Sequence, residues 1–297
     1  MVCTANDKPR WLEARRYGLG SSDGADVLNV GYGSRMACYA SKVLGPKPWD
    51  DDPKKRAGRV LEKAIAEIAQ IELGTGPARV FQLLLRSKRW PLLTCTPDFL
   101  VEAPRLGLVM EETKNTTESE EWEDDRPCRR NWIQCQHQLA VTGQRFMLLV
   151  GLLWGYKLVP IVIERDDKWI EGTYVPALEE FWSLVRARKI PGPDPSESCR
   201  RALVELFPEH APGLTVDLPD LADQPYAFAH EEVERLTAAI GLYQNDIRAR
   251  MQEAETAFLS DGTRWTYKTN KKGVRTLRRW PVKTKDAATA PQEESAA

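Results

Sequence analysis

Two carboxylates and a lysine lie close together in the segment TCTPDFLVEAPRLGLVMEETKNTT, residues 94 to 117. Asp98 precedes one apolar run and Glu112 follows a second one, with Lys114 two residues beyond. The two runs predict adjoining strands of a buried hairpin, with the charged residues at its open end. Because alternate side chains of a strand share a face, Glu112 and Lys114 should point the same way and Glu111 the other way.

The chemistry of such a group is that of a cation site. Burying charged groups is costly unless they pair with one another or hold a metal ion. Carboxylate oxygens are the ligands that Mg²⁺ or Mn²⁺ prefers, and such an ion can polarise a phosphodiester and lower the pKa of an attacking water. Lys114 would then orient that water or neutralise developing charge. A structural salt bridge or a solvated strand end is the alternative reading.

The elements before the hairpin carry further candidates. KKRAGRVLEKAIAEIAQIELG has apolar residues at spacings of three and four and predicts a helix that places Glu62 within its apolar register. Such an acid lies at the edge of the buried face or has a function. Further upstream, WLEARRYGLGSSDG predicts a charged helix, a Gly-rich turn and a second helix that begins near Ser22. Free amides at a helix start suit a phosphate. A strand is expected at 79–85.

After the hairpin, the helical segment RRNWIQCQHQLAVTG places Gln136 facing inward, where a carboxamide needs partners. A satisfied core glutamine and a ligand are both consistent with this position, and His137 is expected to be structural. Two strands, RFMLLVGLLWG and KLVPIVIERD, and a helix at roughly 174–188 follow.

The order of these pieces resembles a known family. T-P-D-F-L, then G-L-V-M-E-E-T-K, preceded by an acid-bearing helix and followed by W-I-Q-C-Q-H-Q-L-A-V-T-G, is similar to the PD-(D/E)xK nuclease superfamily. Within it the pattern across residues 16 to 143 most resembles the lambda exonuclease and YqaJ-like viral recombinase family. The resemblance implies an α/β (α+β) fold, a restriction-endonuclease-like core with a mixed central sheet flanked by helices.

The resemblance also implies roles for individual residues. Glu62, Asp98 and Glu112 would be the metal-site carboxylates, joined by the main-chain carbonyl of Thr113, and Lys114 would be the catalytic lysine. The implied cofactor is Mg²⁺ or Mn²⁺.

Members of this family digest a duplex from its 5′ end and hold the terminal phosphate with an arginine, a serine and a glutamine. The matching positions are Arg16, Ser22 and Gln136, with Thr96 where the family often has serine. A guanidinium fork suits a phosphate. Arg15 and Ser21 are adjacent competitors for these roles.

The chain has 297 residues, a net charge of −1 and scattered cysteines without a C-x-x-C pair. The resemblance implies a nuclease core over 1–190, and the composition beyond it predicts a Pro-rich linker over 191–225, a C-terminal unit over 226–285 and a disordered tail over 286–297. The C-terminal unit is expected to contain a long helix with a coiled-coil-like apolar seam and a basic hairpin. In that hairpin, aromatic and basic residues alternate in a way that suits phosphate contact and base stacking, although a solvated hairpin is the alternative.

The resemblance thus implies a metal-dependent DNA exonuclease, acting 5′ to 3′ on double-stranded ends to leave 3′ single strands for recombination. An endonuclease with the same core and a non-catalytic DNA-binding or assembly protein are the alternatives. The resemblance implies double-stranded DNA ends and a single-strand annealing protein as partners and a homo-oligomer, a trimer in the family. Because no long apolar run or signal-peptide core occurs, no membrane association and a cytoplasmic location, in a phage, prophage or bacterial host, are expected.

Overall fold

The computed structural model describes residues 3–4, 7–45, 52–81, 83–117, 122 and 126–282, with the side chains of 54, 55 and 220–222 outside the description. The chain divides into two compact units, Met1–His210 and Ala211–Ala297. Each unit is described by itself.

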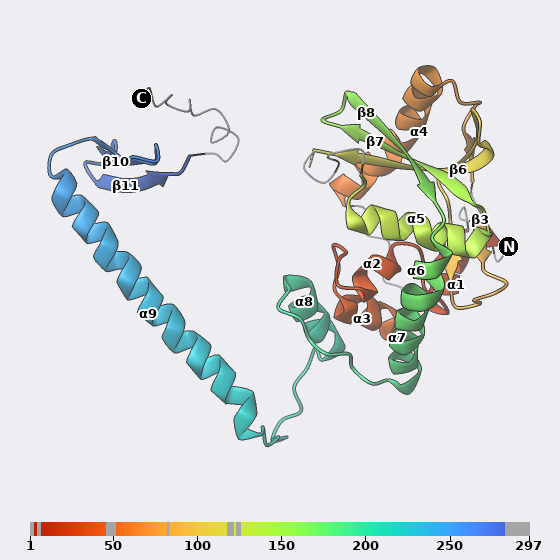
Figure 1. The fold of residues 1–297 in the computed structure, drawn as a ribbon. Helices are drawn as coiled ribbons and strands as arrows, with labels where there is room; N and C mark the ends of the chain where they lie inside the picture. Colours follow the sequence, from red (N-terminus) through yellow and green to blue (C-terminus); the bar gives the residue numbers. More distant parts are fainter. Residues whose placement is uncertain are drawn as a thin grey trace, which may run out of the picture. The chain divides into compact units, whose positions relative to one another are not determined.

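The first unit is built on a five-stranded mixed sheet in the order β2-β5-β6-β7-β8 (Figure 1). Its strands are β2 (Arg79–Val80), β5 (Phe99–Ala103), β6 (Gly107–Thr116), β7 (Phe146–Leu153) and β8 (Lys157–Glu164). β5 and β6 form the predicted hairpin, β6 runs parallel to β7, and β7 pairs antiparallel with β8. The predicted α/β class with a mixed central sheet is confirmed.

Helices cover both faces of this sheet. α4 (Pro53–Leu73) packs against one face, with Ile65, Ala66 and Ala69 in the same core cluster as Val109 and Val150. α5 (Arg129–Thr142) packs against the other face through Cys135 and Leu139. α5 ends at Gly143, which adopts the left-handed conformation and donates its N–H to the Leu139 carbonyl at 2.9 Å. Consecutive residues of β6 therefore face different helices.

The N-terminal helices form a second layer below α5. α1 (Lys8–Arg16), α2 (Asp23–Val27) and α3 (Arg35–Leu44) lie near α7 (Val175–Ala187), which follows the short α6 (Asp167–Trp169) and a π-helical turn (Ile170–Tyr174). A small sheet joins β1 (Cys3–Thr4), β3 (Leu83–Arg86) and β4 (Thr94–Cys95). The single strand expected over 79–85 is thus two strands, β2 and β3, which belong to different sheets.

The sequence did not predict the helices α3 and α8 (Glu197–Leu206). α3 and α8 pack together through the buried side chains of Met36, Ala40, Cys199 and Ala202. The predicted linker over 191–225 therefore differs from the structure, because α8 belongs to the first unit and the next helix begins at Asp220. The high content of proline and acidic residues suggested a linker, whereas Cys199 and Ala202 of α8 are buried against a distant segment.

The second unit contains α9 (Asp220–Met251) followed by the strands β9 (Thr256–Phe258), β10 (Arg264–Thr269) and β11 (Arg275–Trp280). The long helix and the basic hairpin are present, and β9 adds a third strand in the order β11-β10-β9. In the predicted seam, Val233, Leu236 and Ile240 are exposed, whereas Met251 at the end of α9 is buried. The expected tail over 286–297 lies outside the described residues. In the described part of the chain, no helix has both the length and the apolar character to cross a membrane.

Candidate active site

Glu112 is the centre of a buried polar cluster between β6 and α5. The Lys114 ammonium and the Gln134 carboxamide both contact Glu112 Oε1. On the other side, Gln138 Nε2 donates to Glu112 Oε2 at 2.6 Å. Only 2% of Glu112 is exposed, so these donors replace the water that a carboxylate would otherwise keep. Strand alternation thus brings Glu112 and Lys114 together as expected.

Asp98 approaches the same strand from the start of β5. The hairpin register ends with Phe99 opposite Glu111, and Asp98 lies one residue before it. Asp98 Oδ2 accepts hydrogen bonds from the Thr113 amide at 3.0 Å and from the Thr113 hydroxyl at 3.3 Å. Burial raises the pKa of Asp98 well above its usual range; the charges of Glu112 and Glu62 raise it further, while Lys114 opposes them.

Glu62 joins this group from α4. Burial raises the pKa of Glu62, and the negative charge of Glu112 adds to that effect, while Lys114 and Arg59 lower it. Lys114 is held as an ammonium: burial disfavours its charge, but Glu112 and Asp98 outweigh that effect and raise its pKa. Three carboxylates therefore act on one another with one lysine among them, which leaves an excess of negative charge.

The chemistry of this donor set fits a divalent cation such as Mg²⁺. The available ligands are carboxylate oxygens, and a positive ion would relieve the mutual repulsion that adds to burial in raising the pKa values of Asp98 and Glu62. Among the described residues, however, no three His, Cys, Asp or Glu side chains are arranged to hold one ion. Both oxygens of Glu112 already accept hydrogen bonds, so an ion bound to Glu112 would displace one of the hydrogen-bond donors.

Glu111 points away from this cluster. Its side chain is fully buried on the opposite face of β6, and neither carboxylate oxygen has a hydrogen-bond partner within the described part of the chain. Burial raises the pKa of Glu111 to about 7. The alternation of the strand therefore separates Glu111 from Glu112.

A second polar group lies at the N-terminal helices. Arg15 Nη2 donates to Ser22 Oγ at 3.2 Å, and the Arg15 guanidinium lies 4.6 Å from the ring centroid of Trp11. The indole of Trp11 donates to Thr96 Oγ1 at 3.1 Å. Two predicted phosphate ligands, Ser22 and Thr96, are therefore linked through Arg15 and Trp11.

A cavity of about 330 Å³ is lined by Ser22 from the N-terminal helices and by Lys114 and Gln134 from the carboxylate cluster. Tyr32 and Arg130 also line it, and the centroid of the Tyr32 ring lies 4.0 Å from the guanidinium carbon of Arg130. Of the residues proposed for catalysis and for phosphate binding, Lys114 and Ser22 therefore border one space.

Asp23, at the start of α2, fixes the cation next to Ser22. Its Oδ2 contacts Lys42 Nζ at 2.6 Å and accepts from the Gly20 amide at 2.7 Å, and Arg15 lies 3.8 Å from the other oxygen. Burial alone would raise the pKa of Asp23, but Lys42 and Arg15 outweigh it and lower the pKa to about 2. The ionised Asp23 thus orients Arg15.

Arg16 lies elsewhere. Its guanidinium donates to the carbonyls of Lys42 and Val43, both at 3.2 Å, and so satisfies free carbonyls at the end of α3. The structure therefore places Arg15, the adjacent competitor, beside Ser22, and gives Arg16 contacts that join α1 to α3.

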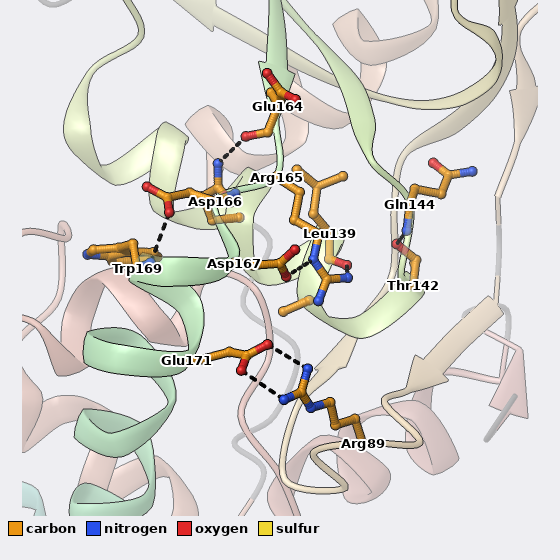
Figure 2. Close-up of polar contacts among 12 residues, drawn as sticks. Arg89, Leu139, Thr142, Gln144, Glu164, Arg165, Asp166, Asp167, Trp169 and Glu171 are labelled. Atoms are coloured by element: carbon orange, nitrogen blue, oxygen red, sulfur yellow. Dashed lines mark hydrogen bonds and ion pairs between the residues drawn. The ribbon is translucent and has the colours of Figure 1, made fainter.

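Gln136 is also separated from the carboxylates. It is fully buried, donates to the Glu164 carbonyl at 2.7 Å and accepts from the Asp166 amide at 2.9 Å. Figure 2 shows how this connection between β8 and α6 is held by further contacts, in which Arg165 donates to Asp167 and to the Leu139 carbonyl. Nε2 and Oε1 of Gln136 therefore both bond to main-chain groups of the protein.

His137 has the structural character expected of it. Its Nε2 contacts the Thr94 carbonyl at 2.9 Å and its Nδ1 contacts the Tyr174 hydroxyl at 2.7 Å. Since a carbonyl can only accept, Nε2 carries the proton and Nδ1 accepts from Tyr174. Burial lowers the pKa of His137 to about 4, so the ring is neutral at pH 7.

Gln134, Gln138 and Trp11 were not identified from the sequence. The two glutamines are four residues apart, so they share one face of α5 and meet Glu112 together. That spacing is a usable signal, because Gln136 between them must face another way. Nothing in the sequence indicates that Trp11 meets Thr96, since the contact joins segments 85 positions apart.

Comparisons with known proteins agree with the resemblance. Residues 10–145 match the model of the YqaJ-like viral recombinase domain. The chain is 26% identical over 266 residues to a protein of Bacillus subtilis (strain 168) named "Uncharacterized protein YqaJ", covering 86% of this chain and 81% of that protein.

Among solved structures, the chain is similar to an alkaline exonuclease from Laribacter hongkongensis, with 20% identity, a TM-score of 0.49 and coverage of 67% of this chain and 100% of the other. It is also similar to a phage-related exonuclease from Haemophilus somnus 129PT, with 11% identity, a TM-score of 0.39 and coverage of 52% and 81%. The segment that matches the YqaJ-like viral recombinase domain model, residues 10–145, is the one that carries the motifs, and this match agrees with the resemblance.

Proposed function

We propose that this protein is a metal-dependent DNA exonuclease that hydrolyses double-stranded DNA from its 5′ ends. The observation that carries the proposal is the cluster around Glu112, in which three carboxylates and one lysine act on one another beside an open cavity. The YqaJ-like viral recombinase domain, which contains all of these residues, supports the same reaction class.

Glu62, Asp98 and Glu112 would hold Mg²⁺ or Mn²⁺, together with the main-chain carbonyl of Thr113. When bound, such an ion polarises the scissile phosphate and lowers the pKa of the attacking water. Lys114 lies at the wall of the cavity and stays positively charged, so it can orient that water or stabilise charge that develops on the phosphate. Gln134 and Gln138 keep the Glu112 carboxylate in place.

The 5′ phosphate would bind at Arg15 and Ser22, with Thr96 and Trp11 behind them. Arg15 supplies a guanidinium fork for the phosphate, and Asp23 holds that fork toward Ser22. Ser22 lines the same cavity as Lys114, so a terminal phosphate bound there would leave the adjoining phosphodiester near Lys114.

The proposed product is a 3′ single strand that serves recombination, and the proposed partners are duplex ends and a single-strand annealing protein. Assembly into a homo-oligomer, a trimer as in the family, and action in the cytoplasm of a phage-infected, lysogenic or other bacterial host belong to the same proposal. The domain model supports the recombination role through its viral recombinase description.

The test uses the purified full chain on linear duplex DNA labelled at either end, with and without a 5′ phosphate, in Mg²⁺ or in EDTA. Mononucleotides released from the 5′ end only when metal is present are the expected result. Covalently closed circular duplex, included in parallel, should remain intact.

Two other outcomes identify the alternatives. Cuts within the circular DNA would show an endonuclease with the same core. DNA binding without hydrolysis in either Mg²⁺ or Mn²⁺, unchanged by Lys114→Ala, would show a non-catalytic DNA-binding protein.

A further inference from the structure

The C-terminal sheet has one face on which basic, hydroxyl and aromatic side chains gather. The register pairs Arg264 with Trp280, Thr266 with Arg278, and Lys268 with Thr276. Because alternate residues of a strand share a face, these six side chains lie on the same side of β10 and β11. They line a shallow cavity of about 420 Å³, and we refer to these six residues as the basic face.

The aromatic group of this face is held in a defined position. Trp280 Nε1 donates to Thr266 Oγ1 at 3.1 Å, and the Arg264 guanidinium lies 5.6 Å from the ring centroid. The Trp280 side chain nevertheless remains 47% exposed. Phe258, opposite Arg264 on β9, is 73% exposed. Two aromatic rings are thus available to a ligand beside the cations.

The charge of the basic face is only partly balanced. Lys268 forms an ion pair with Glu255. Within the described residues, no acid forms an ion pair with Arg264 or Arg278, and both side chains are exposed. Two arginines therefore remain available for an anionic ligand.

On the opposite face of the sheet, Arg275 makes contacts that, among the described residues, the arginines of the basic face lack. Arg275 donates to the carbonyls of Gln252 at 2.6 Å and Ala254 at 3.1 Å, and its guanidinium lies 3.7 Å from the ring centroid of Tyr267. Arg275 thus joins β11 to the segment that follows α9 and supports the fold. The arginines of the basic face make no such contacts with main-chain carbonyls of the described residues, so the fold does not account for them.

We propose that the basic face binds single-stranded DNA, with Arg264 and Arg278 on phosphates and Trp280 and Phe258 stacked on bases. Unpaired bases can stack on exposed aromatic rings while cations follow the backbone, whereas the bases of a duplex are already stacked on one another. This site lies in the second unit and is separate from the carboxylate cluster. Binding at this site requires no hydrolysis, so the proposal does not depend on the proposed nuclease activity.

The test measures the affinity of the full chain for a fluorescent oligothymidylate of about 15 nucleotides, a length within the range of such sites, by anisotropy over a series of salt concentrations in EDTA. Arg278 and Arg279 offer a matched pair, because they are adjacent and exposed but lie on opposite faces of β11. Arg278→Gln and Arg279→Gln remove the same charge, and only the first removes it from the basic face.

Arg278→Gln should weaken binding and reduce the slope of log affinity against log salt by about 0.7, the value for one lost phosphate contact to a single strand. Trp280→Ala should weaken binding about fivefold or more, as expected for the loss of one stacked base. Arg279→Gln should leave both quantities near those of the unmodified chain. Circular dichroism and the thermal midpoint of each variant establish that the sheet is folded.

A second measurement locates the contact directly. An oligonucleotide that carries 5-iodouracil should crosslink on irradiation to peptides of β10 or β11, among them the β11 peptide that contains Trp280. The proposal is overturned if all crosslinks map to residues 1–210, or if Arg278→Gln and Arg279→Gln have equal effects. It is also overturned if Arg278→Gln weakens the binding of duplex DNA and leaves that of the single strand unchanged.

Discussion

Gln138 Nε2, on α5, donates a 2.6 Å hydrogen bond to Glu112 Oε2, on β6. This contact ties the orientation of the central carboxylate to the helix that covers the sheet. The other oxygen of Glu112 has two donors, Lys114 and Gln134. Oε1 therefore keeps a donor when one glutamine is lost, whereas Oε2 depends on Gln138. Loss of one glutamine should therefore matter more than loss of the other.

Gln138→Leu should lower the rate of hydrolysis about 10- to 100-fold, the usual range for loss of a residue that orients a metal ligand. The change leaves Glu112 Oε2 buried without a donor. Gln134→Leu should have a smaller effect, because Lys114 still donates to Oε1. The measurement is nucleotide release from linear duplex, together with the Mg²⁺ concentration that gives half the maximal rate. Equal rates for both variants and the unmodified chain would contradict the orienting role of Gln138.

Arg15→Gln and Arg16→Gln should have different consequences although the two residues are adjacent. Arg15→Gln removes the guanidinium beside Ser22 and should abolish the preference for 5′-phosphorylated ends, seen as a raised KM for such ends. Arg16→Gln removes two bonds to carbonyls of α3 and should destabilise the fold by about 2 kcal/mol, given the range for bonds to charged groups, with the end preference intact. The end preference and the free energy of unfolding are measured for each variant. Loss of the end preference in Arg16→Gln, with the preference intact in Arg15→Gln, would identify Arg16 as the phosphate ligand.

His137 should make the free energy of unfolding depend on pH. Its pKa is about 4 in the folded state, below the usual 6.5, so the unfolded chain binds more protons between these values and stability falls as pH falls from 6.5 toward 4. Between pH 7 and pH 5 this residue should cost about 2 kcal/mol.

His137→Gln keeps a donor for Thr94 and an acceptor for Tyr174 but does not titrate in this range. Urea unfolding at pH 7, 6 and 5 should show that the variant loses about 2 kcal/mol less than the unmodified chain. Equal losses of unfolding free energy in the two proteins would show that folding does not lower the pKa of His137.

Gly24 should not tolerate a side chain. A Cβ at this position would lie 1.9 Å from the Tyr174 hydroxyl oxygen, which donates to His137. Gly24→Ala should therefore destabilise the fold by about 1 to 3 kcal/mol, as overpacking of a close-packed core does. Adding Tyr174→Phe removes the nearest clashing atom and leaves the ring carbon Cζ at 2.8 Å, so the two changes should be less destabilising together than the sum of their separate costs. Simple additivity in thermal unfolding would argue against the contact.

Local patterns in the sequence predicted the parts of the site that lie on one element or on adjoining elements. The alternation of β6 separated Glu112 and Lys114 from Glu111, and helical spacing placed Glu62 on α4. The apolar runs of β5 and β6 predicted the hairpin that carries Asp98. These features depend on short-range periodicity, which a sequence displays directly.

The remaining features depend on contacts between distant segments. Arg15 and Arg16 are equivalent by sequence spacing, and only the packing of α1 against α3 decides which of them reaches Ser22. α3 and α8 bury each other across about 160 positions, as the hydrogen bond that the Ser34 amide donates to Ser198 Oγ illustrates, so neither helix has an independent signal. The resemblance selected Gln136 as a phosphate ligand, and its inward register was consistent with either a ligand or a core residue; its carboxamide binds the end of β8 and the segment that follows.

The most direct test of the proposed site is calorimetric titration of Mn²⁺ into the full chain and into Asp98→Asn. Asp98 and the other two carboxylates should bind the ion, so the unmodified chain should give a saturable isotherm. Asp98→Asn should weaken that binding at least about tenfold, because it removes one charged ligand. Thermal midpoints near that of the unmodified chain in EDTA would exclude misfolding of the variant. Binding of equal affinity in both proteins, or no saturable binding in either, would contradict a metal site at Glu62, Asp98 and Glu112.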